Sequence, residues 1–141
     1  MAAPVDLERR LRDASLRVTA QRVAVLAAVD EHPHADAGTI VRVVRDDLGG
    51  VSTQAVYDVL RALTGAGLVR CIEPPGSLAR YESRTGDNHH HAVCRSCGTI
   101  ADVDCAVGDA PCLTADEGHG FVIDEAEVVY LGLCPDCSTT T

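Results

Sequence analysis

The sequence predicts an α+β protein whose helical N-terminal half ends in a short β-ribbon and is followed by a small α/β unit. Apolar residues recur at helical spacing through residues 5–63, and shorter β-like runs begin at residue 68. Cys-x-x-Cys pairs occur only beyond that point. We therefore expect two domains, residues 1–82 and residues 83–141, each with a small core.

The N-terminal half is expected to contain four helices. The first is a short amphipathic segment over residues 5–16. Each of the next three follows a residue whose side-chain oxygen can cap a helix, and Gly49-Gly50 and Gly65 are expected to end the third and the fourth. The expected caps are Thr19, Asp36 and Ser52.

The fourth helix divides into an apolar face and a polar face. Its valines and leucines share one side at helical spacing, so the opposite side is expected to meet solvent. The residues predicted to face outward are Thr53, Gln54, Tyr57 and Arg61.

A two-stranded ribbon is predicted directly after these helices. Residues 68–72 and 79–82 read as strands, and Pro74-Pro75-Gly76 between them reads as a turn. Helices that end in a ribbon are typical of a winged helix-turn-helix, which inserts its last helix into the major groove of double-stranded DNA. Periodicity alone leaves a plain helical bundle equally open.

Charge is divided unequally along the chain. The whole chain carries a formal net charge of −9. Residues 1–73 hold nine arginines against ten acids, whereas residues 74–141 hold three arginines against eleven acids. The front half can therefore still meet phosphates, and the acidic back half attracts cations.

Two Cys-x-x-Cys pairs indicate a structural zinc site. Cys94 and Cys97 form the first pair, and Cys134 and Cys137 form the second. Four thiolates close a tetrahedral zinc site, which contributes about 10–16 kcal/mol of apparent binding free energy. Free thiols, a redox Cys-x-x-Cys and a zinc enzyme are the alternatives. The enzyme is disfavoured because the site has no open position and no nucleophile with a partner base stands out.

A histidine run directly precedes the first cysteine pair. Its imidazole nitrogens are better suited to binding an exchangeable iron, manganese, nickel or zinc ion than to joining a closed thiolate site. His89 and His91 point the same way in an extended segment, whereas His90 points away and is the weaker candidate ligand.

The back half is expected to form a sheet of about three strands. Residues 99–104, 121–123 and 127–133 read as strands, and a short helix is expected near residues 111–117. The edge and apolar face of such a small sheet would be hidden best by a second copy, so we expect a homodimer.

The cysteines and the start of the chain indicate a cytoplasmic protein. The seven cysteines are an odd number, and their paired spacing is that of metal ligands. No apolar signal segment follows Met1. No apolar stretch approaches the roughly 18 residues of a membrane span, so we expect no membrane association.

Several short motifs span the chain from residue 17 to residue 137. They are Arg17-Val18-Thr19-x-Gln21-Arg22, Ser52-x-x-x-Val56-Tyr57, Gly67-Leu68-Val69, Arg80-Tyr81-Glu82, the histidine-rich Cys-x-x-Cys-Gly segment and the final Cys-x-x-Cys. In this order they strongly resemble the ferric uptake regulator family of metal-dependent, dimeric transcriptional repressors. Within it the chain looks most like the catalase-linked, peroxide-responsive branch of high-GC bacteria.

The resemblance implies a regulatory metal site between the two domains. Matching motif to motif assigns it His34, Glu82, His89, His91 and Asp102. For His34, the alternative is a surface histidine that flanks a helix beside His32. Imidazoles with carboxylates suit Fe(II) or Mn(II), and Ni(II) or Zn(II) stay open because ligand type alone does not separate these ions. The resemblance implies a repressor that binds a palindromic operator when the ion is present.

The DNA contacts expected from the second and fourth helices are limited by one departure from the family pattern. The position after Tyr57, frequently arginine in the family, is Asp58 here, so one familiar contact is missing and phosphate could be repelled. The residues expected to contact DNA are Arg22, Ser52, Thr53, Gln54, Tyr57 and Arg61.

Two further departures concern metal chemistry. Ala126 stands where a second regulatory site would have a histidine, and Glu82 stands where well-understood peroxide sensors have aspartate. Cys105 and Cys112, outside the paired cysteines, are either buried small hydrophobes or accessory redox thiols. The expected function is a peroxide-responsive repressor. A zinc- or nickel-uptake regulator of the same family is one alternative, and a zinc-dependent enzyme or thiol oxidoreductase is another.

Overall fold

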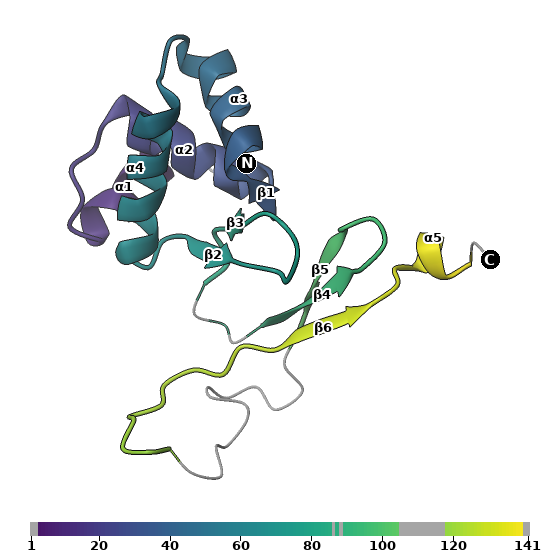
Figure 1. Ribbon diagram of the computed structural model, residues 1–141. Coiled ribbons are helices and arrows are strands. Elements are labelled where there is room, and N and C mark those ends of the chain that lie inside the picture. The colour runs from purple at the N-terminus through teal and green to yellow at the C-terminus, as the bar shows by residue number, and fades with distance from the viewer. Residues whose placement is uncertain (1–2, 86, 88, 105–117, 140–141) are drawn as a thin grey trace. The chain divides into compact units, whose positions relative to one another are not determined.

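The chain divides into two compact units, Met1–Thr85 and Gly86–Thr141, each with its own small sheet (Figure 1). The structure, a computed structural model, describes residues 3–85, 87, 89–104 and 118–139. Within that part of the chain, no helix has the length and apolarity needed to cross a membrane.

The described part of the N-terminal unit contains four helices, and three of them begin at the predicted caps. The side chains of Thr19, Asp36 and Ser52 each accept a hydrogen bond from the backbone N–H three residues later, at 3.0–3.1 Å. The helices are α1 (Pro4–Asp13), α2 (Ala20–Glu31), α3 (Ala37–Leu48) and α4 (Thr53–Gly65).

One predicted helix end is wrong and another is confirmed. The first helix stops at Asp13 instead of residue 16, because Ser15 takes a left-handed conformation with φ of 62°. The fourth helix ends at Gly65, as predicted, and the chain turns away from it at Gly67, whose φ of 78° only glycine adopts at little cost.

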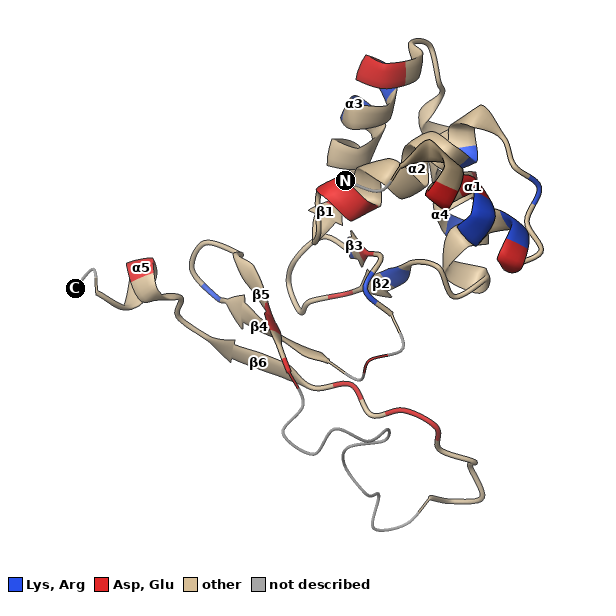
Figure 2. Ribbon diagram, turned by 180° about the vertical axis from the view of Figure 1, so that it is seen from behind, with Lys and Arg blue, Asp and Glu red and all other residues tan. Residues whose placement is uncertain are grey.

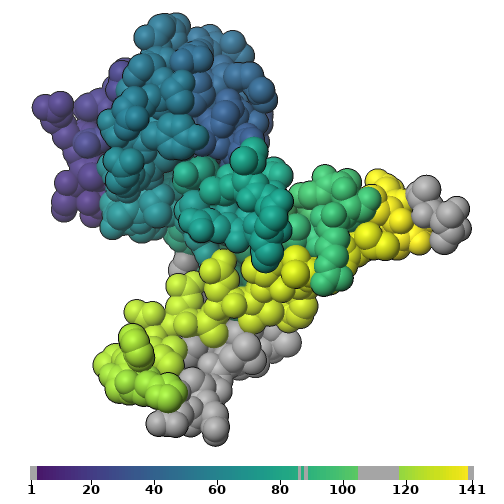
Figure 3. All heavy atoms as spheres, in the orientation of Figure 1, coloured from purple at the N-terminus to yellow at the C-terminus, as the bar shows by residue number. Residues whose placement is uncertain are grey.

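The apolar faces of the four helices share one core. Every helix buries residues at helical spacing, and Figure 3 shows the helical part of this unit as one close-packed body. Its largest fully buried aliphatic side chains are Leu11, Leu26, Ile40, Leu60, Leu63, Val25, Val29, Val44 and Val56.

A three-stranded antiparallel sheet completes the unit as a winged helix-turn-helix. Its strands are β1 (Ala35–Asp36), β2 (Arg70–Ile72) and β3 (Arg80–Glu82), in the order β1-β3-β2. The predicted ribbon corresponds to β2 and β3. The third strand, β1, has no sequence signal because two residues carry no alternation. Its pairing brings the chain before α3 against the end of the wing.

The C-terminal unit is built around the histidine run. The central strand β4 (His90–Cys94) pairs antiparallel with β5 (Ile100–Val103) and parallel with β6 (Val129–Gly132), and α5 (Pro135–Ser138) follows. The strands predicted within residues 99–104 and 127–133 are therefore present.

The predicted strand over residues 121–123 is wrong. Phe121 and Val122 are 78% and 96% exposed and lie outside every strand of the described chain. The histidine run instead forms the central strand, where His90 and His91 are buried between β5 and β6. The helix predicted near residues 111–117, together with Cys105 and Cys112, lies outside the described residues.

Candidate metal centres and nucleic-acid interface

Sheet pairing brings the two Cys-x-x-Cys segments together. The parallel register of β4 and β6 places Cys94 opposite Gly132, and the Arg95 N–H donates to the Gly132 carbonyl at 2.8 Å. The chain leaves β6 two residues before Cys134, which is the N-cap of α5. Both cysteine pairs therefore begin at the same end of the sheet.

A tight turn shapes the first pair. The Gly98 N–H donates to the Cys94 carbonyl at 3.0 Å, and Gly98 has a φ of 79°, which favours glycine. Within this turn the Cys97 N–H donates to the Cys94 sulfur at 3.5 Å. The turn thus aims both sulfurs toward one point.

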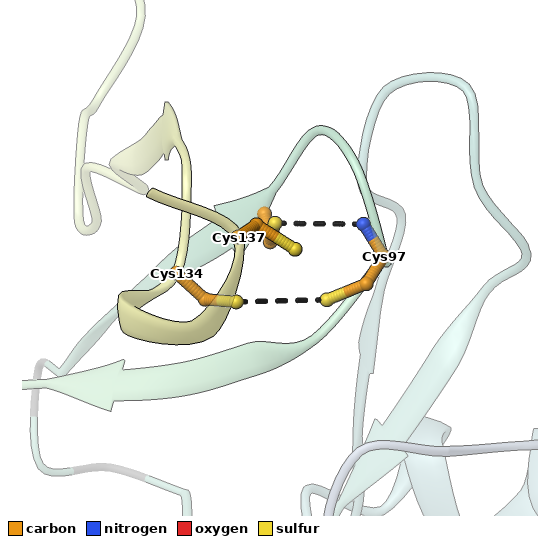
Figure 4. Close-up of side chains that lie close together, drawn as sticks. Cys97, Cys134 and Cys137 are labelled. Atoms are coloured by element: carbon orange, nitrogen blue, oxygen red, sulfur yellow. Dashed lines mark hydrogen bonds between the residues drawn. The ribbon is translucent and has the colours of Figure 1, made fainter. Parts of the chain in front are cut away.

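The four sulfurs have the spacing of a tetrahedral thiolate site. The Sγ atoms of Cys94, Cys97, Cys134 and Cys137 all lie within 4.8 Å of one another. Figure 4 shows Cys97 and Cys134 facing each other. Their sulfurs lie 3.7 Å apart. Zinc–sulfur bonds of about 2.3 Å in a tetrahedron place the sulfurs about 3.8 Å apart, so these residues fit zinc.

Hydrogen bonding shifts the pKa values of three of these thiols in different directions. Backbone N–H groups of Cys134 and Cys97 lower the pKa of Cys94 to about 6, and the Thr99 hydroxyl and N–H lower the pKa of Cys97. A hydrogen bond from Ser96 acts to lower the pKa of Cys137, but the neighbouring thiols raise it to about 12. Such a cluster resists losing all its protons unless a cation replaces them.

A second cluster in the C-terminal unit combines imidazoles with a carboxylate. His91 lies opposite Asp102 in the β4–β5 pair, with its Nε2 3.4 Å from Asp102 Oδ1. His89 Nε2 lies 3.5 Å from the same oxygen, and the two rings meet edge-on with centroids 4.8 Å apart. Both histidines are buried. These three predicted ligands therefore converge within one unit.

Two neighbours of this cluster refine the prediction. His90 turns the other way, as expected, and its Nδ1 accepts a hydrogen bond from the Val128 N–H at 3.2 Å. It therefore ties β4 to the chain before β6. Asp87, which sequence reasoning missed, lies 2.5 Å from His89 Nδ1. A carboxylate near a histidine run is a signal for such a partner, because metal-bound imidazoles usually hydrogen-bond through their second nitrogen.

The N-terminal unit holds the other two predicted ligands side by side. His34 Nε2 lies 3.2 Å from Glu82 Oε2, and both residues are held by the small sheet. The His34 N–H donates to the Tyr81 carbonyl at 2.9 Å, and Arg80 Nη1 donates to the His34 carbonyl at 3.2 Å. His34 has a φ of 67°, a left-handed conformation that is uncommon outside glycine.

The outward face of α4 carries the residues of this helix that are predicted to contact DNA. Tyr57 is 42% exposed, and the remaining candidates on this helix are exposed as well. Arg45 on α3 donates to the Val51 carbonyl at 2.9 Å and to Thr53 Oγ1 at 3.1 Å, which fixes the start of α4. Ser52 serves as the helix cap. Sequence reasoning missed Arg45 because its role depends on the turn between the helices.

Arg22 lies on α2 beside this face. Its Nη1 donates to the Arg17 carbonyl at 2.8 Å, so one guanidinium nitrogen orders the loop before α2. Arg17 and Arg22 line a groove of about 280 Å³ that also reaches Ala55, Asp58 and Val59 of α4. Figure 2 shows that arginine segments gather in the N-terminal unit. The sequence has a single arginine, Arg95, beyond residue 85.

A winged helix-turn-helix joined to a unit with a four-cysteine cluster defines a class of metal-dependent DNA-binding regulators. The family model described as "Ferric uptake regulator family" matches residues 13–130. The chain therefore belongs to the ferric uptake regulator family, whose members are metal-responsive transcriptional regulators and not enzymes.

Individual relatives agree with this assignment. The chain is 69% identical over 138 residues to the transcriptional regulator FurA of Mycobacterium tuberculosis strain H37Rv, covering 98% of this chain and 94% of that protein. The peroxide-responsive repressor PerR of Staphylococcus saprophyticus is 30% identical over 128 residues, covering 90% and 86%. The structure of the Helicobacter pylori ferric uptake regulator Fur matches with a TM-score of 0.72 at 18% identity, covering 97% and 95%. That likeness confirms the fold class.

Proposed function

We propose that this protein is a homodimeric repressor that binds a palindromic operator in the cytoplasm when a regulatory divalent ion is bound. Residues 1–82 would bind DNA, and residues 83–141 would bind metal and dimerise. The observation that carries the proposal is that the predicted donors are grouped within each unit, as His34 with Glu82 and as His89, His91 with Asp102.

The proposed regulatory ion is Fe(II) or Mn(II), held by these five residues together. Nitrogen and carboxylate donors suit both ions, and Ni(II) or Zn(II) are the alternatives within the same family. The Helicobacter pylori ferric uptake regulator Fur has three functional metal binding sites. A relative with several metal sites supports a regulatory site in addition to the cysteine cluster, which we propose holds structural zinc.

Metal dependence follows from linkage. An ion that takes ligands from both units binds best to one arrangement of them. If that arrangement also binds DNA better, the ion strengthens DNA binding by the same factor by which DNA strengthens metal binding. Loss of the ion, or damage to one ligand, would then release the operator.

The C-terminal unit supports dimerisation. Among its described residues, Val93 and Cys94 are the buried apolar side chains, whereas Tyr130, Leu131 and Leu133 are exposed. These three line an apolar hollow of about 310 Å³ on the sheet. Regulators of this family are typically dimeric. A second copy of the chain is therefore the proposed cover for this surface.

Peroxide is the proposed signal. Its support is the 30% identity to a peroxide-responsive repressor and the donor set, since Fe(II) supplies electrons to peroxide when bound. The imidazoles of His89 and His91 lie side by side and would be the first groups reached by an oxidant formed there.

The test uses DNA selected by the protein itself. Duplexes are enriched from a randomised library with the zinc-loaded protein plus Mn(II), and binding is then measured with Mn(II), Fe(II), Ni(II), Zn(II) or no added ion. The proposal expects a two-fold symmetric motif and binding that depends on Mn(II) or Fe(II). Response to Zn(II) or Ni(II) alone would favour the metal-uptake alternative, and metal-independent binding would contradict the proposal.

A further inference from the structure

The carboxylate of Asp58 lies on the outward face of α4, among the residues predicted to contact DNA. Asp58 Oδ1 accepts a hydrogen bond from Gln54 Nε2 at 2.9 Å and another from Arg61 Nη1 at 3.2 Å. Gln54 and Arg61 are themselves predicted to contact DNA, and all three side chains are exposed. One oxygen of Asp58 thus orders a residue on either side of it along α4.

The surroundings of Asp58 are cationic. Arg61 forms an ion pair with it, and Arg17 and Arg22 line the same groove as Asp58. Exposed pairs of this kind stabilise a helix only slightly, because solvent screens them. Helix stability is therefore a small effect of Asp58, whereas a negative charge that approaches DNA phosphates is a large one.

A uniform repulsion would weaken all DNA binding without improving selectivity. The carboxylate improves selectivity only if it has a favourable partner in the correct complex. Such partners are amino groups on the major-groove edges of bases, and carboxylates accept from the N4 amino group of cytosine. The major-groove edge of guanine offers N7 and O6, both acceptors, and these would repel it.

We propose that Asp58 is a specificity-determining residue, which selects a C·G pair in each half of the operator by accepting a hydrogen bond from the cytosine amino group. Its Oδ1 orders Gln54 and Arg61, and its Oδ2 faces the base. The inference rests on the proposed function, because it requires α4 to enter the major groove. It assigns the base that is contacted by residue 58, where the family frequently has an arginine.

The experiment repeats the duplex selection with Asp58→Asn and Asp58→Ala, each compared with the parent. Asp47→Asn is the matched control, because it removes one exposed negative charge from α3 of the same unit. Binding of each enriched motif is then measured with Mn(II) over a range of salt concentrations. Replacing the selected C·G pair by T·A should weaken the parent by about 5- to 150-fold.

Three results are expected from the variants. Asp58→Ala should lose the preference at that pair and bind the two duplexes within about twofold of each other, while the rest of the motif stays the same. Asp58→Asn should shift the preference toward adenine, whose N6 and N7 an asparagine contacts together. Asp47→Asn should keep the parental motif.

The outcomes separate the two proposals. If the parent enriches a motif and both Asp58 variants enrich the same one, Asp58 only stabilises the helix surface and the inference is overturned while the proposed function stands. If the parent enriches no motif with any of the ions, the proposed function fails and the inference fails with it.

Discussion

His34 Nε2 lies 3.2 Å from Glu82 Oε2, and Glu82 is only 2% exposed. A buried carboxylate is costly unless cations or hydrogen-bond donors compensate it. A divalent ion shared with an imidazole supplies such compensation. The pair is held by backbone hydrogen bonds of the β1–β3 ladder, so it is available before any ion arrives.

Removing one regulatory donor should abolish metal-dependent DNA binding while zinc content and dimerisation persist. His91→Ala and Asp102→Ala take donors from the C-terminal cluster, and Glu82→Gln removes the buried charge of the N-terminal pair. Each should weaken Mn(II) affinity by more than about tenfold, since even outer partners of a metal site are worth about 10- to 100-fold. Calorimetric titration with Mn(II) and duplex binding measure this.

The control for these variants is His32→Ala, which removes an exposed histidine close to His34. It should respond to Mn(II) like the parent. A parental response in either His91→Ala or Asp102→Ala would mean that the regulatory site lies elsewhere.

Loss of one cysteine of the thiolate cluster should unfold the C-terminal unit. This unit buries few apolar side chains among its described residues, whereas structural zinc contributes about 10–16 kcal/mol of apparent binding free energy. Cys94→Ser should therefore lose its zinc and become monomeric. Metal analysis after mild chelation and light scattering after size-exclusion chromatography measure both effects.

Cys71→Ser is the matched control, because Cys71 lies on β2 of the N-terminal unit. It should retain about one zinc per chain, as expected for a single four-thiolate site. A folded Cys94→Ser dimer without zinc would contradict the structural role of the cluster.

Local signals are predictable from the sequence, and long-range pairing is not. Thr19, Asp36 and Ser52 are recognisable as caps because a cap depends on a side chain and the backbone three residues away. By contrast, β1 exists only because β3 offers it an edge. The apolar run at residues 121–123 has strand-like composition, yet sequence alone does not reveal which segments find partners.

The candidate sites likewise divide into residues that a local pattern reveals and residues that only long-range contacts reveal. Paired cysteines reveal their chemistry by spacing, so the thiolate cluster is predictable from the residues themselves. Asp102 is assigned only through the family resemblance, because a single aspartate in a strand has no distinguishing pattern. Asp87 and Arg45 escape sequence reasoning, since their roles depend on contacts that only the folded chain makes.

The Asp36 cap should make the stability of the N-terminal unit depend on pH. The hydroxyl and the backbone N–H of Thr39 hold the pKa of Asp36 below its usual value. Because the folded pKa is the lower one, the cap stabilises above the unfolded pKa of about 4 and is lost as pH falls through the folded value. Asp36→Ala should therefore cost about 1 kcal/mol near neutral pH and less in acid.

Urea unfolding followed by circular dichroism at several pH values measures this difference. Asp36→Asn is the control, because its amide oxygen still caps α3 but does not titrate between about pH 2 and pH 7. A pH-independent cost of Asp36→Ala would show that the carboxylate is not the capping group.

Tyr57 and the arginines should differ in how they affect DNA binding. Tyr57 is expected to meet base edges, so Tyr57→Ala should weaken the selected duplex more than a random one. Arg61→Ala should weaken both alike and reduce the salt slope by about 1, which corresponds to one lost phosphate contact. Arg22→Ala should do the same and also loosen the loop that Arg22 orders through the Arg17 carbonyl.

Fluorescence anisotropy on both duplexes over a range of salt concentrations gives the two quantities. Equal losses of selected and random binding in Tyr57→Ala would count against a base contact. An unchanged salt slope in Arg61→Ala would remove it from the phosphate contacts.

Peroxide should leave a covalent modification that identifies the residues it oxidises. If Fe(II) lies beside His89 and His91, treatment with peroxide should add one oxygen to the peptide that contains them and release the duplex. The mark should survive a thiol reductant, because oxidised imidazole is not reduced by thiols. A route through Cys105 and Cys112 would instead give a disulfide that the reductant reverses. Mass spectrometry before and after reduction distinguishes the two.

The Mn(II)-loaded protein is the control for this experiment, since Mn(II) is not expected to reduce peroxide at this site and the duplex should stay bound. His90 provides an internal comparison, because its Nδ1 is engaged by the Val128 N–H and its ring points away from the cluster. Fragment ions should therefore place the added oxygen on His89 or His91. Release of DNA without either mark would mean that the protein responds to metal supply and not to peroxide.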